Sequence, residues 1–277
     1  MDLNWLDFLD KEIALPGRKP VKILAKAPGC LRLVTFNVRF GRKIAEIAHS
    51  FKNYPNLAQA DVILLQEIED HHKEKTPRAA HLAKLLQMDY VYVPSRRLPL
   101  SRGTHGSAIL SRWPLREATA IRLPVYRFLR LHPRVALSAE LDFFGRKIKI
   151  FNIHLNGSLN YKKREAQLNE IVKLIDRDNS RKPVILAGDF NTIPLLTLAD
   201  TSLPIFYSNQ RKKLHAFLKR RGFETNRLRA GHTSRWGLLR FQLDGIYPKN
   251  ARVAQFGVER QVRLSDHFPL WADIKVR

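Results

Sequence analysis

The chain has 277 residues, of which 44% are hydrophobic, so it can bury a full-sized core without disulfide bonds. It contains one cysteine, which excludes a disulfide framework and a cysteine-rich zinc site. The 49 Lys and Arg residues against 25 Asp and Glu give a net charge of +24. Such an excess favours a polyanionic partner, with nucleic acid first and an anionic membrane surface second.

No stretch approaches the ~18 consecutive apolar residues of a membrane-spanning helix. The first residues, MDLNWLDFLDKE, carry three Asp and no apolar run of signal-peptide length. We therefore expect a soluble, cytoplasmic protein, and a monomer. Residues 1–28 are predicted to form an N-terminal extension, an amphipathic piece followed by a linker with Pro and Lys, and residues 29–277 a single domain.

From residue 31 onward, short apolar runs alternate with helical patterns. The apolar runs, typical of buried strands, predict strands at 31–36, 61–67, 105–111, 147–155, 183–190, 241–248 and 269–276. Helical patterns lie at 43–51, 79–87, 162–177 and 209–222. The stretch from 105 to 155 is predicted to hold consecutive strands, with turns at 113–114 and 144–146. Strands therefore outnumber helices, which favours a layered α/β sandwich over a simple doubly wound sheet.

Polar side chains follow the first two strands. Asn37 comes directly after the run 31–36, where an Asn also commonly makes a turn. Glu67 follows DVILL, and an acid there is costly unless it is at the surface or bound to a cation. A hard divalent ion such as magnesium prefers one or two carboxylates together with water and phosphate oxygens. Taken alone, however, an acid at the position of Glu67 is more often a solvated strand end.

The strands in the middle of the chain carry a second polar group. Alternation places Asn152, His154 and Asn156 on one face of strand 147–155, which favours a cleft over a single structural histidine. In AGDFN, Asp189 and Asn191 are two residues apart and can point into one pocket, to hold water and a phosphoryl oxygen. The glycine before them allows close approach by a backbone or a phosphate. An Asx turn is the alternative for this pair.

A histidine and two acids close the set. His267 can act as a base or bind phosphate near neutral pH, and such a histidine commonly has a carboxylate that fixes its tautomer. Asp266 adjoins His267 and points elsewhere if the segment is extended. Asp244 is therefore the better partner for the ring, and Asp266 the better metal or water contact.

Together and in this order, the motifs resemble the endonuclease/exonuclease/phosphatase superfamily, which has the fold of deoxyribonuclease I. The resemblance covers about residues 31–276 and rests on TFNV, LLQE, GSAILSRWP, NIHLN, AGDFNT, LDGIY and LSDHFPL. GDFN and SDHFP are the most specific of these. The resemblance implies a four-layer α/β/β/α sandwich of two packed mixed β-sheets flanked by helices, and a single catalytic domain at 29–277.

The resemblance also implies roles for the polar residues. Magnesium would be held by Glu67, with Asn37 and Asp266 beside it, and manganese is an alternative because the same oxygen ligands serve both ions. The implied catalytic residues are His154, Asp189, Asn191, Asp244 and His267.

Two positions depart from the apurinic endonucleases of this superfamily. Those enzymes carry an acid two residues after the first Asn, and here that position is Arg39. His154 stands where the exonuclease-III branch has a Tyr. Both departures point away from apurinic-site repair and towards the general branch, which also holds lipid and tyrosyl-DNA phosphodiesterases.

The sequence therefore predicts a magnesium-dependent phosphodiester hydrolase, first of all a nuclease acting on DNA or RNA. Asn156, Arg102 and Arg134 are predicted to contact the substrate, although the glycine turn after Arg102 can also be an ordinary turn. Trp236 adjoins Arg235, an aromatic and a cation as in single-strand binding, and such mixtures also occur in loops that pack on a core.

Two alternatives remain open at this point. One is a phosphodiesterase or phosphatase for a phospholipid head group or another small phosphoester, whose charge would serve attraction to a membrane. The other is a catalytically inactive nucleic-acid-binding module. The complete motif set argues against the second alternative, because no catalytic His or Asp is lost.

Overall fold

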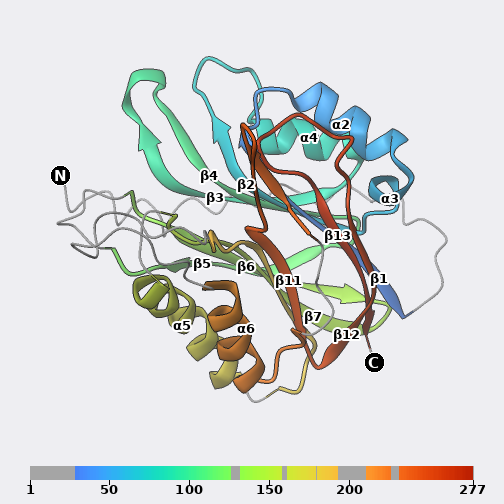
Figure 1. Cartoon of the computed structure of the whole chain (residues 1–277). Helices are drawn as coiled ribbons and strands as arrows, with labels where there is room; N and C mark the ends of the chain where they lie inside the picture. Colours follow the sequence, from blue (N-terminus) through green and yellow to red (C-terminus); the bar gives the residue numbers. More distant parts are fainter. Residues whose placement is uncertain are drawn as a thin grey trace, which may run out of the picture.

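Two β-sheets pack face to face, with helices on the outer face of each (Figure 1). The structure is a computed structural model that describes residues 29–125, 132–157, 161–178, 180–192, 210–225 and 231–276. The four layers are those of the expected α/β/β/α sandwich. The predicted extension at 1–28 lies outside the described residues.

The first sheet has six strands in the order β12-β13-β1-β2-β4-β3. Their bounds are β1 (Cys30–Phe40), β2 (Val62–Asp70), β3 (Asp89–Leu98), β4 (Gly103–Ser111), β12 (Ala251–Val258) and β13 (Leu270–Val276). Strands β1 and β2 are parallel, and every other neighbouring pair in this sheet is antiparallel. A turn of 3-10 helix, Pro99–Ser101, joins β3 to β4.

The second sheet has five strands in the order β11-β8-β7-β6-β5. Their bounds are β5 (Leu115–Arg122), β6 (Val135–Phe143), β7 (Arg146–His154), β8 (Val184–Asp189) and β11 (Asp244–Lys249). Here β7 and β8 form the parallel pair. A separate two-stranded hairpin consists of β9 (Ser234–Trp236) and β10 (Leu239–Phe241).

Helices α2 (Ile44–Asn53), α3 (Pro55–Ala58) and α4 (Arg78–Leu86) lie on the side of the six-stranded sheet, and α5 (Tyr161–Arg177) and α6 (Gln210–Arg220) on the side of the five-stranded sheet (Figure 1). The periodicity of the apolar residues explains this packing. In α5 the buried residues include Leu168, Ile171, Val172 and Ile175, which form one stripe of the helix as the sequence predicts.

All seven predicted strands and all four predicted helices are present, with ends that differ by a few residues. One strand is divided: Phe241 ends β10, and β11 begins only at Asp244. The predicted turns after β4 and after β6 are also present. In the described residues no helix is long and apolar enough to cross a membrane.

Candidate active site

The candidate site lies where the carboxyl ends of the two parallel strand pairs meet. Asn37 and Glu67 lie near the ends of β1 and β2, and His154 and Asp189 are the last residues of β7 and β8. In open sheets the carboxyl ends of parallel strands form a crevice in which ligands bind. Each sheet therefore contributes one pair of polar side chains to a shared edge of the sandwich.

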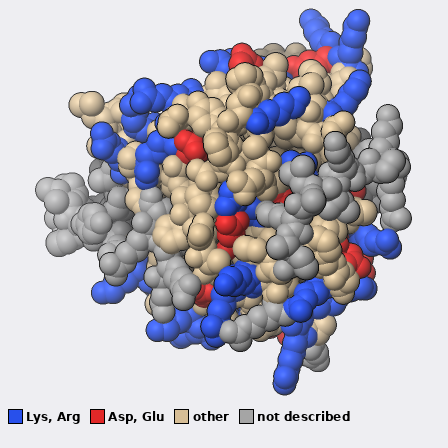
Figure 2. Space-filling view, turned by 90° about the vertical axis from the view of Figure 1, so that its right-hand side faces the viewer, with Lys and Arg blue, Asp and Glu red and all other residues tan. Residues whose placement is uncertain are grey.

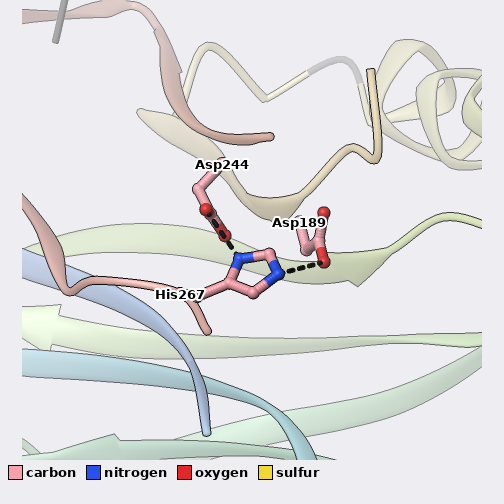
Figure 3. A group of neighbouring side chains, drawn as sticks. All are labelled: Asp189, Asp244 and His267. Carbon is pink, nitrogen blue, oxygen red and sulfur yellow. Dashed lines mark hydrogen bonds and ion pairs between the residues drawn. The ribbon is translucent and has the colours of Figure 1, made fainter. Parts of the chain in front are cut away.

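The remaining site residues reach this edge from antiparallel neighbours. Asp244 begins β11 and pairs with Asp189 in the register of β11 and β8. His267 lies just before β13, whose first residue, Leu270, pairs with Thr35 of β1. Figure 3 shows the result: the ring of His267 lies between the carboxylates of Asp244 and Asp189.

Asn37 joins the two sheets. Its Nδ2 atom donates to Oε1 of Glu67 at 3.2 Å and to Oδ2 of Asp189 at 3.1 Å. Its Oδ1 atom accepts a hydrogen bond from the backbone N–H of Arg39 at 3.1 Å. The Asn37 amide thus holds two carboxylates in place, while its oxygen is engaged by the backbone.

Glu67 occupies an irregular position in β2. Its φ is +57°, and the pairing of β2 with β4 shifts between Leu65 and Ile68. Positive φ is uncommon for a residue other than glycine, and such strain is often found at functional sites. The irregularity turns the Glu67 side chain out of the core: it is 24% exposed, whereas Gln66 and Ile68 are fully buried.

The AGDFN segment is shaped by the turn and the close packing that its sequence indicates. The backbone N–H of Asn191 donates to Oδ1 of Asp189 at 2.9 Å, so an Asx turn is present here. The Asn191 side chain donates to the carbonyl of Leu155 at 2.9 Å. Gly188 has a φ of +140°, and a Cβ atom there would meet the carbonyl oxygen of Ile153. The glycine therefore allows close approach of the β7 backbone and fixes Asp189 beside it.

His154 is buried beside two acids and one cation. Its Nε2 atom lies 3.7 Å from Oε1 of Glu67 and 3.6 Å from Oδ2 of Asp189. Its Nδ1 atom lies 3.2 Å from Nη1 of Arg134, which can only donate, so Nδ1 accepts and the ring proton is on Nε2. Burial, followed by the positive charge of Arg134, holds the pKa of His154 well below its usual value. A neutral imidazole thus directs its N–H towards the two carboxylates.

His267 is held from both sides. Its Nδ1 atom is 3.0 Å from Oδ2 of Asp244, and its Nε2 atom is 3.8 Å from Oδ2 of Asp189 (Figure 3). Burial acts to lower the pKa of His267, but the charges of Asp244 and Asp189 outweigh it and raise the pKa to about 10. Burial, partly offset by the charge of His267, raises the pKa of Asp189 to about 6. His267 is therefore a cation at neutral pH.

Several side chains here have the chemistry of metal ligands. Asp189, Asp244 and His267 form a group whose ligand atoms all lie within 4.8 Å of one another. A protonated imidazole between two carboxylates offers no lone pair, so this group is better suited to hold a proton than a metal.

Glu67 and Asp266 are the two partly exposed acids among the predicted site residues, with side chains that are 24% and 26% exposed. Oδ1 of Asp266 accepts from the Ser265 hydroxyl at 3.1 Å, and Oδ2 lies 4.0 Å from Nη1 of Arg39. Partly exposed carboxylates next to a buried polar cluster fit a hard divalent cation such as magnesium.

Three of the predicted residues are placed differently from the rest. Nδ2 of Asn156 lies 3.5 Å from the carbonyl of His132, and its backbone N–H donates to Gln167 at 3.1 Å. Arg102 is exposed in the turn before β4, and within the described residues no hydrogen bond or ion pair joins its side chain to the site. Asn152 shares its face of β7 with His154, but its Nδ2 donates across the sandwich to the carbonyls of Leu65 and Ala108. It therefore fastens one sheet to the other.

Two supporting residues were not predicted. Thr233 accepts at Oγ1 from the backbone N–H groups of Leu243 and Asp244, at 3.0 and 3.1 Å, and so fixes the start of β11. Arg164 is buried on α5 and donates to the carbonyls of Asn156 and Gly157, at 3.3 and 3.1 Å. The sequence did contain a signal for Arg164, because it lies one turn before Leu168 on the buried face of the helix.

Known proteins are similar to this chain over most of its length. A family model described as the Endonuclease/Exonuclease/phosphatase family matches residues 34–267. "Uncharacterized protein YbhP" of Escherichia coli is 27% identical over 262 residues, which cover 86% of this chain and 90% of YbhP.

Two solved structures show the same fold. An endonuclease/exonuclease/phosphatase from Beutenbergia cavernae has a TM-score of 0.71 at 19% identity, and the match covers 90% of this chain and 72% of that one. An AP endonuclease from Archaeoglobus fulgidus has a TM-score of 0.62 at 17% identity, covering 87% and 98%. Because the family model spans the site from β1 to His267, the chain belongs to the endonuclease/exonuclease/phosphatase family.

Proposed function

We propose that this protein is a divalent-metal-dependent phosphodiester hydrolase that uses water as the nucleophile. The observation that carries the proposal is the meeting of Asp189, His154 and His267 at one point, with each imidazole within 3.8 Å of the same Asp189 oxygen. A carboxylate between a neutral N–H donor and an imidazolium suits a reaction in which a proton is removed on one side while negative charge grows on the other.

In the proposed reaction, Asp189 takes a proton from the attacking water. The new bond from the water oxygen to phosphorus forms as the bond to the leaving oxygen breaks. The Asp189 carboxylate is positioned for this by the Asx turn and by Asn37, and its pKa of about 6 leaves it ionised at neutral pH.

The two histidines provide positive charge and a hydrogen-bond donor. His267, oriented by Asp244, is a cation next to Asp189 and supports the charge that develops on the phosphoryl oxygens. His154 directs its Nε2–H to the same place, because Arg134 occupies Nδ1. Asn191 acts through the backbone contacts that hold Asp189 and Leu155.

Glu67 and Asp266 would hold the divalent ion, with Asn37 fixing the orientation of Glu67. When bound, magnesium or manganese would supply charge neutralisation at a non-bridging phosphate oxygen and at the leaving oxygen.

Nucleic acid is the first substrate class, because the net charge of +24 favours a polyanion. Figure 2 shows the side of the molecule where β1 begins and β13 ends, which is the opposite end of the strands from the site. Basic side chains are spread over that face with acidic ones among them, so it carries no single basic patch. At the site itself, Arg39 is a basic rim residue whose side chain is 58% exposed. Arg39 stands where apurinic endonucleases carry an acid, and its positive charge would attract a phosphate.

A phospholipid head group is the second substrate class, and one specific observation favours it. The β9–β10 hairpin, which contacts the backbone of Asp266, exposes Trp236, Leu238 and Leu239 to solvent. Exposed apolar side chains beside a phosphodiesterase site suit a substrate that lies in a membrane.

One assay panel tests both the activity and the substrate class. Plasmid DNA, single-stranded oligonucleotide, RNA, phospholipid vesicles and bis-p-nitrophenyl phosphate are each incubated with magnesium and with a chelator, using wild type and Asp189→Asn. We expect turnover of at least one natural substrate that requires both metal and Asp189. If Asp189→Asn cleaves every substrate at the wild-type rate, the proposal is wrong. Nucleic-acid binding that weakens steeply with salt but gives no cleavage would indicate a binding module instead.

A further inference from the structure

The β9–β10 hairpin carries an apolar tip that nothing in its own fold requires. Leu238 is 98% exposed, Leu239 is 54% exposed and Trp236 is 41% exposed. Only Trp236 has an aromatic neighbour among the described residues, an edge contact to Phe241 with ring centroids 5.2 Å apart. Leaving leucines in water has a cost that a surface turn could avoid with polar residues, so the tip is fitted to another apolar medium.

The hairpin is fastened directly to the catalytic segment. Its base forms a β-bridge between Ser234 and His267, and the backbone N–H of Arg235 donates to the Asp266 carbonyl at 2.8 Å. The Ser234 hydroxyl donates to the same carbonyl at 3.0 Å. A partner bound at the tip would therefore lie close to His267, because the hairpin pairs directly with the segment that carries this residue.

Cations flank the apolar tip. Arg235 and Arg240 are direct partners in the register of the hairpin, and both are exposed. Like charges directly opposite each other in a two-stranded ribbon are destabilising unless an anion lies between or beside them. The hairpin thus combines an apolar tip with a pair of exposed arginines behind it.

The turn between β3 and β4 repeats the pattern. Leu100 is fully exposed, with exposed Arg97 and Arg102 on either side. Figure 1 shows β3 and β4 extending together beyond the body of the six-stranded sheet. Thr104, just after the turn, pairs with Asp70 at the carboxyl end of β2, so this turn lies at the same end of the strands as the site.

We propose that these two tips dock the protein on an anionic phospholipid bilayer, with the leucines and Trp236 in the interfacial layer and the arginines at the lipid phosphates. Apolar side chains backed by Arg are typical of interfacial anchors, and each cation near an anionic leaflet adds to the attraction. Nucleic acid is the less suited occupant of the tips, because base stacking uses aromatic rings, and the most exposed side chains here are aliphatic. This inference rests on the proposed function in one respect only: docking would bring a phosphodiesterase site close to the lipid head groups.

The test is binding to vesicles in the presence of chelator, so that no turnover is needed. The full chain is sedimented with vesicles of phosphatidylcholine alone and with phosphatidylglycerol added. We expect wild type to bind the anionic vesicles, and Leu238→Ser/Leu239→Ser to bind at least about tenfold more weakly, because two apolar side chains no longer leave water. The matched control is Leu174→Ser on α5, an exposed leucine outside both tips, which should bind as wild type does.

Two further variants separate the parts of the surface. Arg235→Ala/Arg240→Ala should lose most of its preference for anionic over neutral vesicles. The tryptophan emission of wild type should shift to the blue on binding, and Trp236→Phe should lose most of that shift, because Trp236 is the tryptophan of the hairpin tip.

The proposal fails if wild type does not bind anionic vesicles, or if the double leucine variant binds them as tightly as wild type. A loss of affinity for oligonucleotide but not for vesicles in that variant would also overturn it. Hydrolysis of bis-p-nitrophenyl phosphate, a soluble diester, tests the proposed activity separately from membrane binding. A protein that binds vesicles but hydrolyses no substrate would contradict the proposed hydrolase activity and leave the docking proposal intact.

Discussion

Asp189 and Asp244 are direct register partners on β8 and β11, and the ring of His267 lies between their carboxylates. Two like charges facing each other across a sheet repel, so the pair is stable only with a cation between them. His267 is that cation, and the same attraction to the two carboxylates raises its pKa. The three residues therefore act as one unit, in which one imidazolium directs an N–H to each of two acids.

Asp244→Asn should lower kcat about 100-fold or more, the usual scale for losing a group that orients a proton-transferring histidine. The substitution keeps the shape of the side chain but removes the charge that holds the imidazolium. KM should change little, because Asp244 faces the ring and not the opening of the site. Asp176→Asn, on the surface of α5, is the matched control and should retain full activity. An Asp244→Asn enzyme with wild-type kcat would remove Asp244 from the mechanism.

Glu67→Gln should raise the metal concentration needed for half-maximal activity, with a loss of roughly 100-fold or more at limiting metal. The amide keeps the size of the carboxylate but loses the charge that a hard cation prefers. The measurement is activity against magnesium concentration, and separately against manganese. If the metal titration of Glu67→Gln coincides with that of wild type, the ion is held elsewhere.

Arg134→Ala should allow His154 to take up a proton at higher pH than in wild type. In the folded protein the guanidinium occupies Nδ1 and its charge opposes protonation, second only to burial. The measurement is the pH titration of the His154 ring by NMR, alongside kcat. Arg146→Ala, at the far end of β7, is the control. Equal His154 titration curves in wild type and Arg134→Ala would show that Arg134 does not fix the ring.

The sequence was sufficient for the elements that carry the site. Buried central strands such as β1, β2 and β8 leave continuous apolar runs, and the polar residue that ends each run is visible because it interrupts the pattern. The proximity of Asp244 to His267 followed from the opposite directions of neighbouring side chains in an extended segment.

The strands that the sequence did not reveal lie at sheet edges. β3 contains Pro94, beside a register shift, and has two arginines just before its last residue, while most of β12 is exposed or half-buried. An edge strand needs only one buried face and tolerates Pro and charge, so its apolar signal is weak. The short β9–β10 hairpin is held by Asp266 and His267, a contact between distant segments that no local pattern reports.

The site details that stayed hidden are those set by contacts across the sandwich. The side chain of Asn152 reads in sequence as a cleft residue, like His154 two positions later. In the structure it bonds to the opposite sheet, because Gln66 and two backbone carbonyls face it there. Strand alternation gives the face on which a side chain lies, but not whether the position is under the opposite sheet or at its edge.

Stability at acid pH should depend on His105. His105 on β4 is buried, and burial, followed by the charges of Arg96, Arg134 and His132, lowers its pKa from 6.5 to about 3. Between these values the unfolded chain binds a proton at this position and the folded chain does not. The free energy of unfolding therefore falls as pH drops from 6.5 towards 3. The stabilising contribution of the unprotonated His105 is fully present only above pH 6.5.

His105→Asn removes that titration. Urea unfolding of wild type and variant at pH 7.5, 5.5 and 4.5 should give a stability difference, wild type minus variant, that shrinks steadily as the pH falls. Other groups that titrate in this range, such as Asp189, are present in both proteins and largely cancel in the difference. A difference that is constant from pH 7.5 to 4.5 would mean that the folded protein accommodates a protonated His105, for example through Glu69, whose Oε1 lies 3.5 Å from Nδ1.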